Sequence, residues 1–173
     1  PNSVGGAENV VKSIDGLLCE FGAKPEFFTL VDGESNRLGS WLFNRSVHSS
    51  FIQKLPFGIS HVQKYLPLLP FAIEQFDLSD YPLVISSSHL VAKGVLTSPD
   101  QLHVCYVHTP VRYAWDQMNI YLKRSFFKHL GLESFVRWEL HHLRQWDQLS
   151  SARPDLLLAN SSFTARRIAK YWR

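Results

Sequence analysis

Three short apolar segments that each end in polar residues constrain the fold of this chain most. They run from Tyr81 to Ser86, from His103 to Val107 and from Asp155 to Ala159. Segments that are apolar at nearly every position are typical of strands buried on both faces, as in parallel sheets. Because the carboxyl ends of parallel strands open onto the ligand crevice, we expect the polar residues that follow to gather at one edge of the sheet.

Helical patterns alternate with these strands. Apolar spacing and turn signals predict helices after Gly5 and Gly6 up to Phe21, over Val91 to Val95, over Tyr113 to Lys128, over Glu133 to Ser150, and from a cap at Ser161 or Ser162 to the basic end of the chain. Phe27 to Val31 is predicted to be a strand, Asp32 to Ser60 to be irregular, and Tyr65 to Gln75 to be a helix broken by its prolines. The predicted fold class is therefore α/β: a three-layer Rossmann-like domain with a mainly parallel sheet.

Length and composition predict one globular domain. The chain has 173 residues, of which 45% are hydrophobic and 19% charged, which is enough to bury a core. Cys19 and Cys105 lack metal-ligand or disulfide-framework spacing, so we expect reduced thiols in a cytoplasmic protein. No apolar stretch reaches the ~18 residues that a membrane span requires. A net charge of +3 permits attraction to phosphates or anionic lipid without requiring either.

Several enzyme classes are disfavoured by motifs that the sequence lacks. It contains no phosphate-binding loop of the Walker type, no G-x-S-x-G nucleophile turn, no H-E-x-x-H and no cysteine pair at zinc spacing. It also lacks two aspartates separated by one residue, which could hold a metal on a nucleotide diphosphate. We therefore expect no metal ligands, and we expect a diphosphate to be neutralised by helix ends and basic side chains.

A family resemblance is carried by four stretches in a fixed order. They are Gly5 to Glu8, Lys64 to Val95 (KYLPLLPFAIEQFDLSDYPLVISSSHLVAKGV), Gln101 to Asp116 (QLHVCYVHTPVRYAWD) and Leu156 to Trp172 (LLLANSSFTARRIAKYW). Together they resemble the amino-terminal domain of family-4 glycosyltransferases of the GT-B type, and most closely the bacterial mannosyltransferase-like enzymes of surface polysaccharide and lipopolysaccharide biosynthesis. The resemblance spans nearly the whole chain. The resemblance implies that residues 1–173 form the acceptor-side domain without its first strand, and that the donor-binding domain is absent from this chain.

The resemblance also implies an activity. Such enzymes are retaining and metal-independent, and they transfer a sugar from a GDP- or UDP-linked donor to a glycan or polyprenyl-linked acceptor. The implied partners are these two substrates and the missing carboxyl-terminal domain, with peripheral membrane contact and no nucleic acid, so the isolated chain is expected to be inactive. The rival interpretation is a non-catalytic Rossmann-like nucleotide or glycan binding module, or a docking subunit. Sequence beyond Arg173 that encodes a second α/β domain with paired glutamates would favour the transferase.

The resemblance assigns the catalytic and donor-binding residues. His108 is expected to hydrogen-bond the donor sugar or the leaving phosphate, and the alternative is a histidine with a structural role. Gly5 and Gly6 are expected to approach the donor diphosphate or the acceptor across the cleft, whereas the alternative is a helix start that needs permissive backbone. Arg112 is expected to bind phosphate, and its alternative is an ion pair with Asp116.

Acceptor binding is assigned to seven residues with side chains suited to sugar hydroxyls or rings: Glu8, Ser88, His89, Tyr113, Asp116, Asn160 and Ser161. The alternative for the serines is helix capping, and we slightly favour a core position for Trp115. The run from Tyr121 to Lys128 combines aromatic and basic residues, which fits either an anionic membrane surface or an ordinary amphipathic helix. Trp138, His142 and Trp146 recur at one-turn spacing, which predicts a packed stripe.

Overall fold

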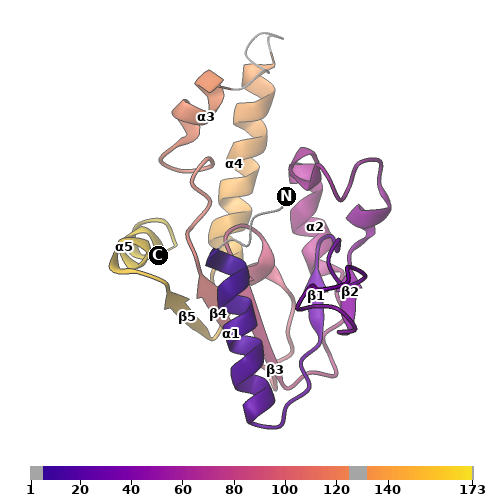
Figure 1. The fold of residues 1–173 in the computed structure, drawn as a ribbon. Helices are drawn as coiled ribbons and strands as arrows, with labels where there is room; N and C mark the ends of the chain where they lie inside the picture. Colours follow the sequence, from indigo (N-terminus) through magenta and orange to yellow (C-terminus); the bar gives the residue numbers. More distant parts are fainter. Residues whose placement is uncertain (1–5, 125–131, 173) are drawn as a thin grey trace. The chain divides into compact units, whose positions relative to one another are not determined.

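The computed structural model describes residues 6–124 and 132–172, and it is a mixed α/β structure with two small parallel sheets (Figure 1). The helices are α1 (Gly6–Glu20), α2 (Leu69–Glu74), α3 (Met118–Arg124), α4 (Glu133–Ser150) and α5 (Ser162–Tyr171), and the strands are β1 (Phe27–Thr29), β2 (Val47–Ser49), β3 (Leu83–Ser88), β4 (Leu102–Val107) and β5 (Leu156–Ala159). The chain forms two compact units that divide between residues 76 and 77. Among the described helices, none is both long and apolar enough to cross a membrane.

The first unit contains α1, a two-stranded sheet and α2. Helix α1 is amphipathic as expected and ends at Glu20, and Gly22 follows it with a φ of +78°, the left-handed turn that glycine adopts easily. Strand β1 pairs in parallel with β2, which lies in a region that we expected to be irregular. That expectation was wrong for β2, because a strand of three residues is too short to show a period. The core of this unit includes Ile52 and Leu69.

The second unit is built on three parallel strands in the order β3-β4-β5. Ser86 of β3 pairs with Cys105 of β4, and Cys105 pairs with Leu157 of β5. The predicted parallel arrangement of the three apolar segments is therefore confirmed. The assignment of the chain as a single domain stays a prediction.

The expectation that these strands are buried on both faces was wrong. In β4, His103, Cys105 and Val107 are buried, whereas the alternate residues of the same strand are only partly buried or exposed. In β5, Leu156 and Leu158 are 52% and 49% exposed. A continuous apolar run shows that a strand can be buried on both faces, but it does not show that both faces are covered.

Most predicted helices are present. Helix α4 has the predicted bounds, and α5 begins after Ser161, whose Oγ accepts the N–H of Thr164 at 3.1 Å. The helix predicted from Tyr113 begins only at Met118, because residues 111–117 form turns, and its predicted end at Lys128 lies outside the described residues. The proline-containing helix is broken as expected into a 3-10 segment, Val62–Leu68, followed by α2.

Candidate functional site at the carboxyl edge of the sheet

The polar residues at the carboxyl ends of β3, β4 and β5 meet at one edge of the second unit's sheet. The Ser87 Oγ lies 2.8 Å from the His108 Nε2, and the His108 N–H donates to the Ser88 carbonyl at 2.8 Å. On the other side of β4, the Asn160 N–H donates to the Val107 carbonyl at 3.2 Å. The shared edge that the sequence predicts is therefore present in the structure.

His108 stands at the centre of this edge and is half-buried. Its ring centroid lies 5.1 Å from that of Tyr106, and its carbonyl accepts the hydroxyl of Thr164 at 3.1 Å. Burial, and next the electrostatic effect of His89, lower the pKa of His108 below its usual value of 6.5, so the imidazole is neutral at pH 7. Within the described residues its Nδ1 has no hydrogen-bond partner, and a neutral ring with one nitrogen held can donate to or accept from a ligand.

The last two residues of β3, Ser87 and Ser88, differ in what their side chains bond. The Ser88 side chain is 2% exposed and its Oγ accepts the N–H of Lys93 at 3.3 Å, so this hydroxyl is used within the fold, although Ser88 is not the cap of the short 3-10 helix Ala92–Gly94. Ser87, its neighbour, is the serine whose hydroxyl reaches His108. The geometry therefore favours Ser87 over Ser88 as a ligand-facing group, and His89 is exposed beside them.

The two residues that follow β5, Asn160 and Ser161, also differ in what their side chains bond. The Ser161 Oγ caps α5 and also lies 3.2 Å from the Thr164 hydroxyl, so its hydrogen bonds are used within the fold. The side chain of Asn160 is exposed and has no hydrogen bond to another described residue. Sequence reasoning missed Thr164, whose position one turn into a capped helix is the signal that could have identified it.

The turn after His108 places Arg112 and Tyr113 beside a hollow of about 250 Å³, which Gln117, Ile120 and Tyr121 also line. Arg112 is exposed, and within the described residues its guanidinium has no ion-pair partner. The expected alternative partner, Asp116, instead forms a bidentate ion pair with Arg167 of α5. Burial raises the pKa of Tyr113, so its hydroxyl remains a protonated donor.

The glycine-rich start of the chain belongs to the first unit. Gly5 lies outside the described residues, and Glu8 is exposed in the first turn of α1. A Cβ at Gly6 would meet no atom within 4 Å and its φ is not left-handed, so the fold does not require glycine there. The roles expected for these residues stay predictions.

A buried ion pair that the sequence analysis missed lies within the second unit. Lys93 and Asp147 have no exposed side-chain surface, and the Lys93 Nζ lies 2.5 Å from the Asp147 Oδ1. The indole N–H groups of Trp115 and Trp172 both donate to the Asp147 Oδ2 at 2.8 Å. Burial lowers the pKa of Lys93, and Asp147 opposes that effect. Trp115, with its ring stacked on Tyr171 at 4.7 Å, is therefore part of the packing.

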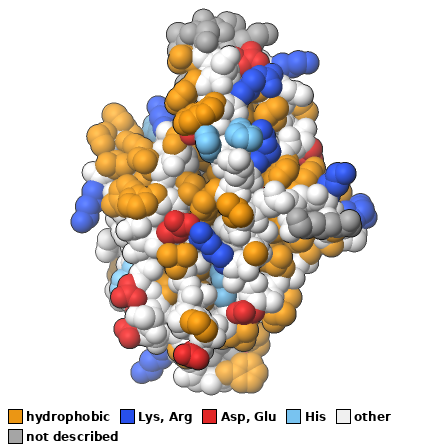
Figure 2. Space-filling view, turned by 180° about the vertical axis from the view of Figure 1, so that it is seen from behind, with side chains coloured by type: hydrophobic (Ala, Val, Ile, Leu, Met, Phe, Trp, Pro, Cys, Tyr) orange, Lys and Arg blue, Asp and Glu red, His pale blue; other side chains and the backbone are white. Residues whose placement is uncertain are grey.

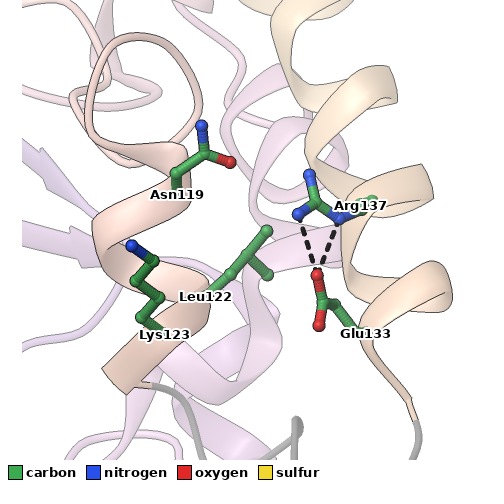
Figure 3. A pocket seen from close by; sticks show the side chains of 5 residues that line it. All are labelled: Asn119, Leu122, Lys123, Glu133 and Arg137. Carbon is green, nitrogen blue, oxygen red and sulfur yellow. Dashed lines mark hydrogen bonds and ion pairs between the residues drawn. The ribbon is translucent and has the colours of Figure 1, made fainter.

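A second hollow, of about 320 Å³, lies between α3 and α4 (Figure 3). Asn119, Leu122 and Lys123 project from α3, and across from them Arg137 binds one carboxylate oxygen of Glu133 through Nε and Nη2 at 2.9 and 2.8 Å. Since Glu133 neutralises Arg137, the formal charge that remains in the hollow is that of Lys123. None of the site residues predicted from sequence lines it.

The outer surface of α4 is aromatic. Trp138 is 55% exposed, and its ring stacks with Phe135 and meets His142 edge-on, with centroids 4.3 Å apart. Hydrophobic side chains also reach the surface beside histidines in Figure 2. The expectation of a packed stripe was wrong for Trp138 and His142, because the buried positions of α4 follow a different line that passes through Asp147.

Comparisons with protein families, curated proteins and solved structures found no match to this chain. Within residues 6–124 and 132–172, no group of three or more His, Cys, Asp or Glu side chains is placed to hold a metal ion. The candidate site therefore consists of the neutral His108, the side chains of Ser87 and Asn160, and a nearby turn in which Arg112 is exposed.

Proposed function

We propose that this chain is the acceptor-side half of a retaining, metal-independent GT-B glycosyltransferase of family-4 type, built as a three-layer Rossmann-like domain. In this proposal a second domain, outside the chain, binds most of a GDP- or UDP-linked sugar. The complete protein transfers that sugar, for example mannose, to a glycan or polyprenyl-linked acceptor of bacterial surface polysaccharide. The 173-residue chain alone does not catalyse this sugar transfer.

The observation that carries the proposal is the neutral His108 at the carboxyl edge of three parallel strands. Its Nε2 is held by Ser87 at 2.8 Å, and its Nδ1 has no partner in the described part of the chain. A neutral imidazole oriented in this way can hydrogen-bond a sugar hydroxyl or a phosphate oxygen without placing a second charge beside a sugar ring. The exposed guanidinium of Arg112 has the planar geometry that binds phosphate oxygens in pairs.

The proposed reaction needs little covalent chemistry from these residues. The acceptor hydroxyl attacks the anomeric carbon on the face from which the nucleoside diphosphate departs, and the departing phosphate oxygen takes the hydroxyl proton. The protein contributes by positioning the acceptor and by stabilising the charge that develops on the phosphate. His108 acts as a hydrogen-bonding group and not as a nucleophile.

The same proposal places the protein in the cytoplasm, in peripheral contact with the membrane that carries lipid-linked acceptors. Tyr121 is 39% exposed on α3, and Lys123 is exposed two residues later. The two side chains project from different sides of α3 and line different hollows, and a helix that carries both basic and exposed aromatic residues favours an anionic lipid surface. Flotation with anionic and neutral vesicles tests this contact, and equal absence of binding to both would contradict it.

The activity is tested by a transfer assay on the protein extended through its donor-binding domain. Labelled GDP- and UDP-sugars are screened with lipid-linked and glycan acceptors, and the best pair is used to compare variants. His108→Ala should lower turnover by about 10²-fold, the usual effect of losing one positioned hydrogen-bonding group, whereas His61→Ala, which alters an exposed histidine of the first unit, should not. Turnover of His108→Ala within about twofold of wild type would rule out the role of His108. Tight binding of a nucleotide-sugar or glycan without any transfer would favour the binding module instead.

A further inference from the structure

The Asp147 carboxylate receives one donor from each of the three connections that follow the strands of the second unit. Lys93 lies in the connection after β3 and donates to Oδ1 at 2.5 Å. Trp115 lies in the turn after β4, and Trp172 lies at the end of α5, which follows β5; both donate to Oδ2 at 2.8 Å. A single side chain of α4 therefore joins three segments that are distant in sequence.

Burial makes these bonds strong and directional. Asp147 and Lys93 are 0% exposed, and the Lys93 ammonium also lies 4.8 Å from the centroid of the Trp172 ring. Hydrogen bonds to an ionised acceptor are stronger than neutral ones, and a low local dielectric strengthens them further. A displacement of any one donor would leave a buried charge poorly satisfied, so the three segments hold their positions together.

Each donor belongs to a segment that also contains or bonds a group of the candidate site. The backbone N–H of Lys93 binds the Ser88 hydroxyl at 3.3 Å, directly after Ser87. Trp115 belongs to the same turn as Arg112, where its N–H bonds the Arg112 carbonyl at 3.2 Å. Trp172 follows the last residue of α5, and the first turn of the same helix contains Thr164, whose hydroxyl donates to the His108 carbonyl at 3.1 Å.

We propose that Asp147 is a positioning residue of the candidate site: its carboxylate fixes the ends of β3, β4 and β5 relative to one another, so that Ser87, His108 and Asn160 present one surface. Asp147 is fully buried, so a ligand bound at the surface has no access to its carboxylate. The proposal rests on the proposed function only for the identity of the ligand, since the placement of the three strand ends can be measured without one.

The test compares two buried substitutions in α4 by NMR on the 173-residue chain. Asp147→Asn keeps the shape of the side chain and removes its charge, whereas Leu140→Ala opens a cavity in the same helix at a residue that is 1% exposed. Both substitutions destabilise the second unit, so if Asp147 had a purely structural role, the two variants would change the NMR signals of the site to the same extent. We expect the His108 ring and Asn160 side-chain signals to shift in Asp147→Asn by at least twice their shift in Leu140→Ala. Equal shifts, or wild-type signals in Asp147→Asn, would overturn the proposal.

Two milder variants decide the question if Asp147→Asn does not fold. Trp115→Phe removes one indole donor but keeps a ring against Tyr171, and Trp172→Phe removes the other. We expect Trp115→Phe to shift chiefly the signals of Arg112 and its turn, and Trp172→Phe to shift chiefly those of Thr164 and His108. Variants that leave these signals unchanged would overturn the proposal. Because these readouts contain no sugar, absence of transfer activity in the complete protein would reject the proposed function and leave this result standing.

Discussion

Replacement of Lys93 with methionine tests the buried ion pair on which the second unit depends. The ammonium lies 2.5 Å from the Asp147 Oδ1, and neither side chain has exposed surface. Methionine fills most of the same space without the charge. The Asp147 carboxylate would keep its two indole donors but lose the cation that balances it in a site that water does not reach.

The expected loss is large compared with the stability of a small domain. Removing one partner of a buried ion pair costs about 3–5 kcal/mol, whereas whole domains are stable by about 5–15 kcal/mol. The Arg137–Glu133 pair of α4 gives a matched control, because its side chains are 44% and 38% exposed and such pairs contribute only about 0.3–0.5 kcal/mol. Lys93→Met should therefore cost several times more than Arg137→Met.

Urea unfolding followed by tryptophan fluorescence measures both variants. Trp115 and Trp172 bond Asp147 directly, so their emission reports the unit in which the pair lies. The double variant Lys93→Met, Asp147→Leu should recover most of the lost stability, because no uncompensated charge remains. A free energy of unfolding for Lys93→Met within about 1 kcal/mol of that for Arg137→Met would refute the argument that burial sets the cost.

Three further predictions concern single side chains. Gly94→Ala would place a Cβ 2.4 Å from the Trp146 ring and should lower the free energy of unfolding by about 1–3 kcal/mol. In the control Gly6→Ala, the added Cβ meets no atom within 4 Å and should not lower the melting temperature. Equal melting temperatures for the two variants would contradict this. Burial lowers the pKa of His103, so below about pH 6.5 the unfolded chain binds a proton that the folded chain does not. The free energy of unfolding should therefore fall as the pH drops from 7.5 to 5, by up to about 1.4 kcal/mol per pH unit for this group, and urea titrations that do not vary with pH would oppose it. Burial also raises the pKa of the Cys105 thiol, which is 0% exposed, so a thiol reagent should modify it only after unfolding, whereas the exposed Cys19 should react at once; rapid labelling of Cys105 itself in the native state would count against the packing of β4.

The three strands of the second unit could be predicted from sequence because each apolar segment is short and is followed by polar residues. That pattern predicted that β3, β4 and β5 run parallel and that His108 and Asn160 lie at one edge of the sheet. The cap at Ser161 was predictable for a local reason, since a serine before a helix satisfies a free N–H of its first turn. These features depend on residues close together in the chain.

Features that depend on distant residues were not predictable in the same way. The bonds between Asp147 and its three donors join positions 25 to 54 residues apart, and no local pattern identifies such partners. One signal was present: Asp147 lies on the line of buried residues in α4 together with Leu140 and Leu143, and an acid at a core position indicates a buried partner. The exposure of Leu156 and Leu158 could not be predicted, because an apolar side chain does not reveal whether another element covers it.

The shared edge of the three strands is the claim on which the site depends, and NOE measurements around His108 test it most directly. With labelled histidine and serine in the 173-residue chain, the His108 ring should show NOEs to the side chain of Ser87, and its backbone N–H should show them to Ser88. The Asn160 N–H should show contacts to Val107 from the opposite side of β4. A His108 ring whose NOEs reach only residues adjacent in sequence would contradict the account.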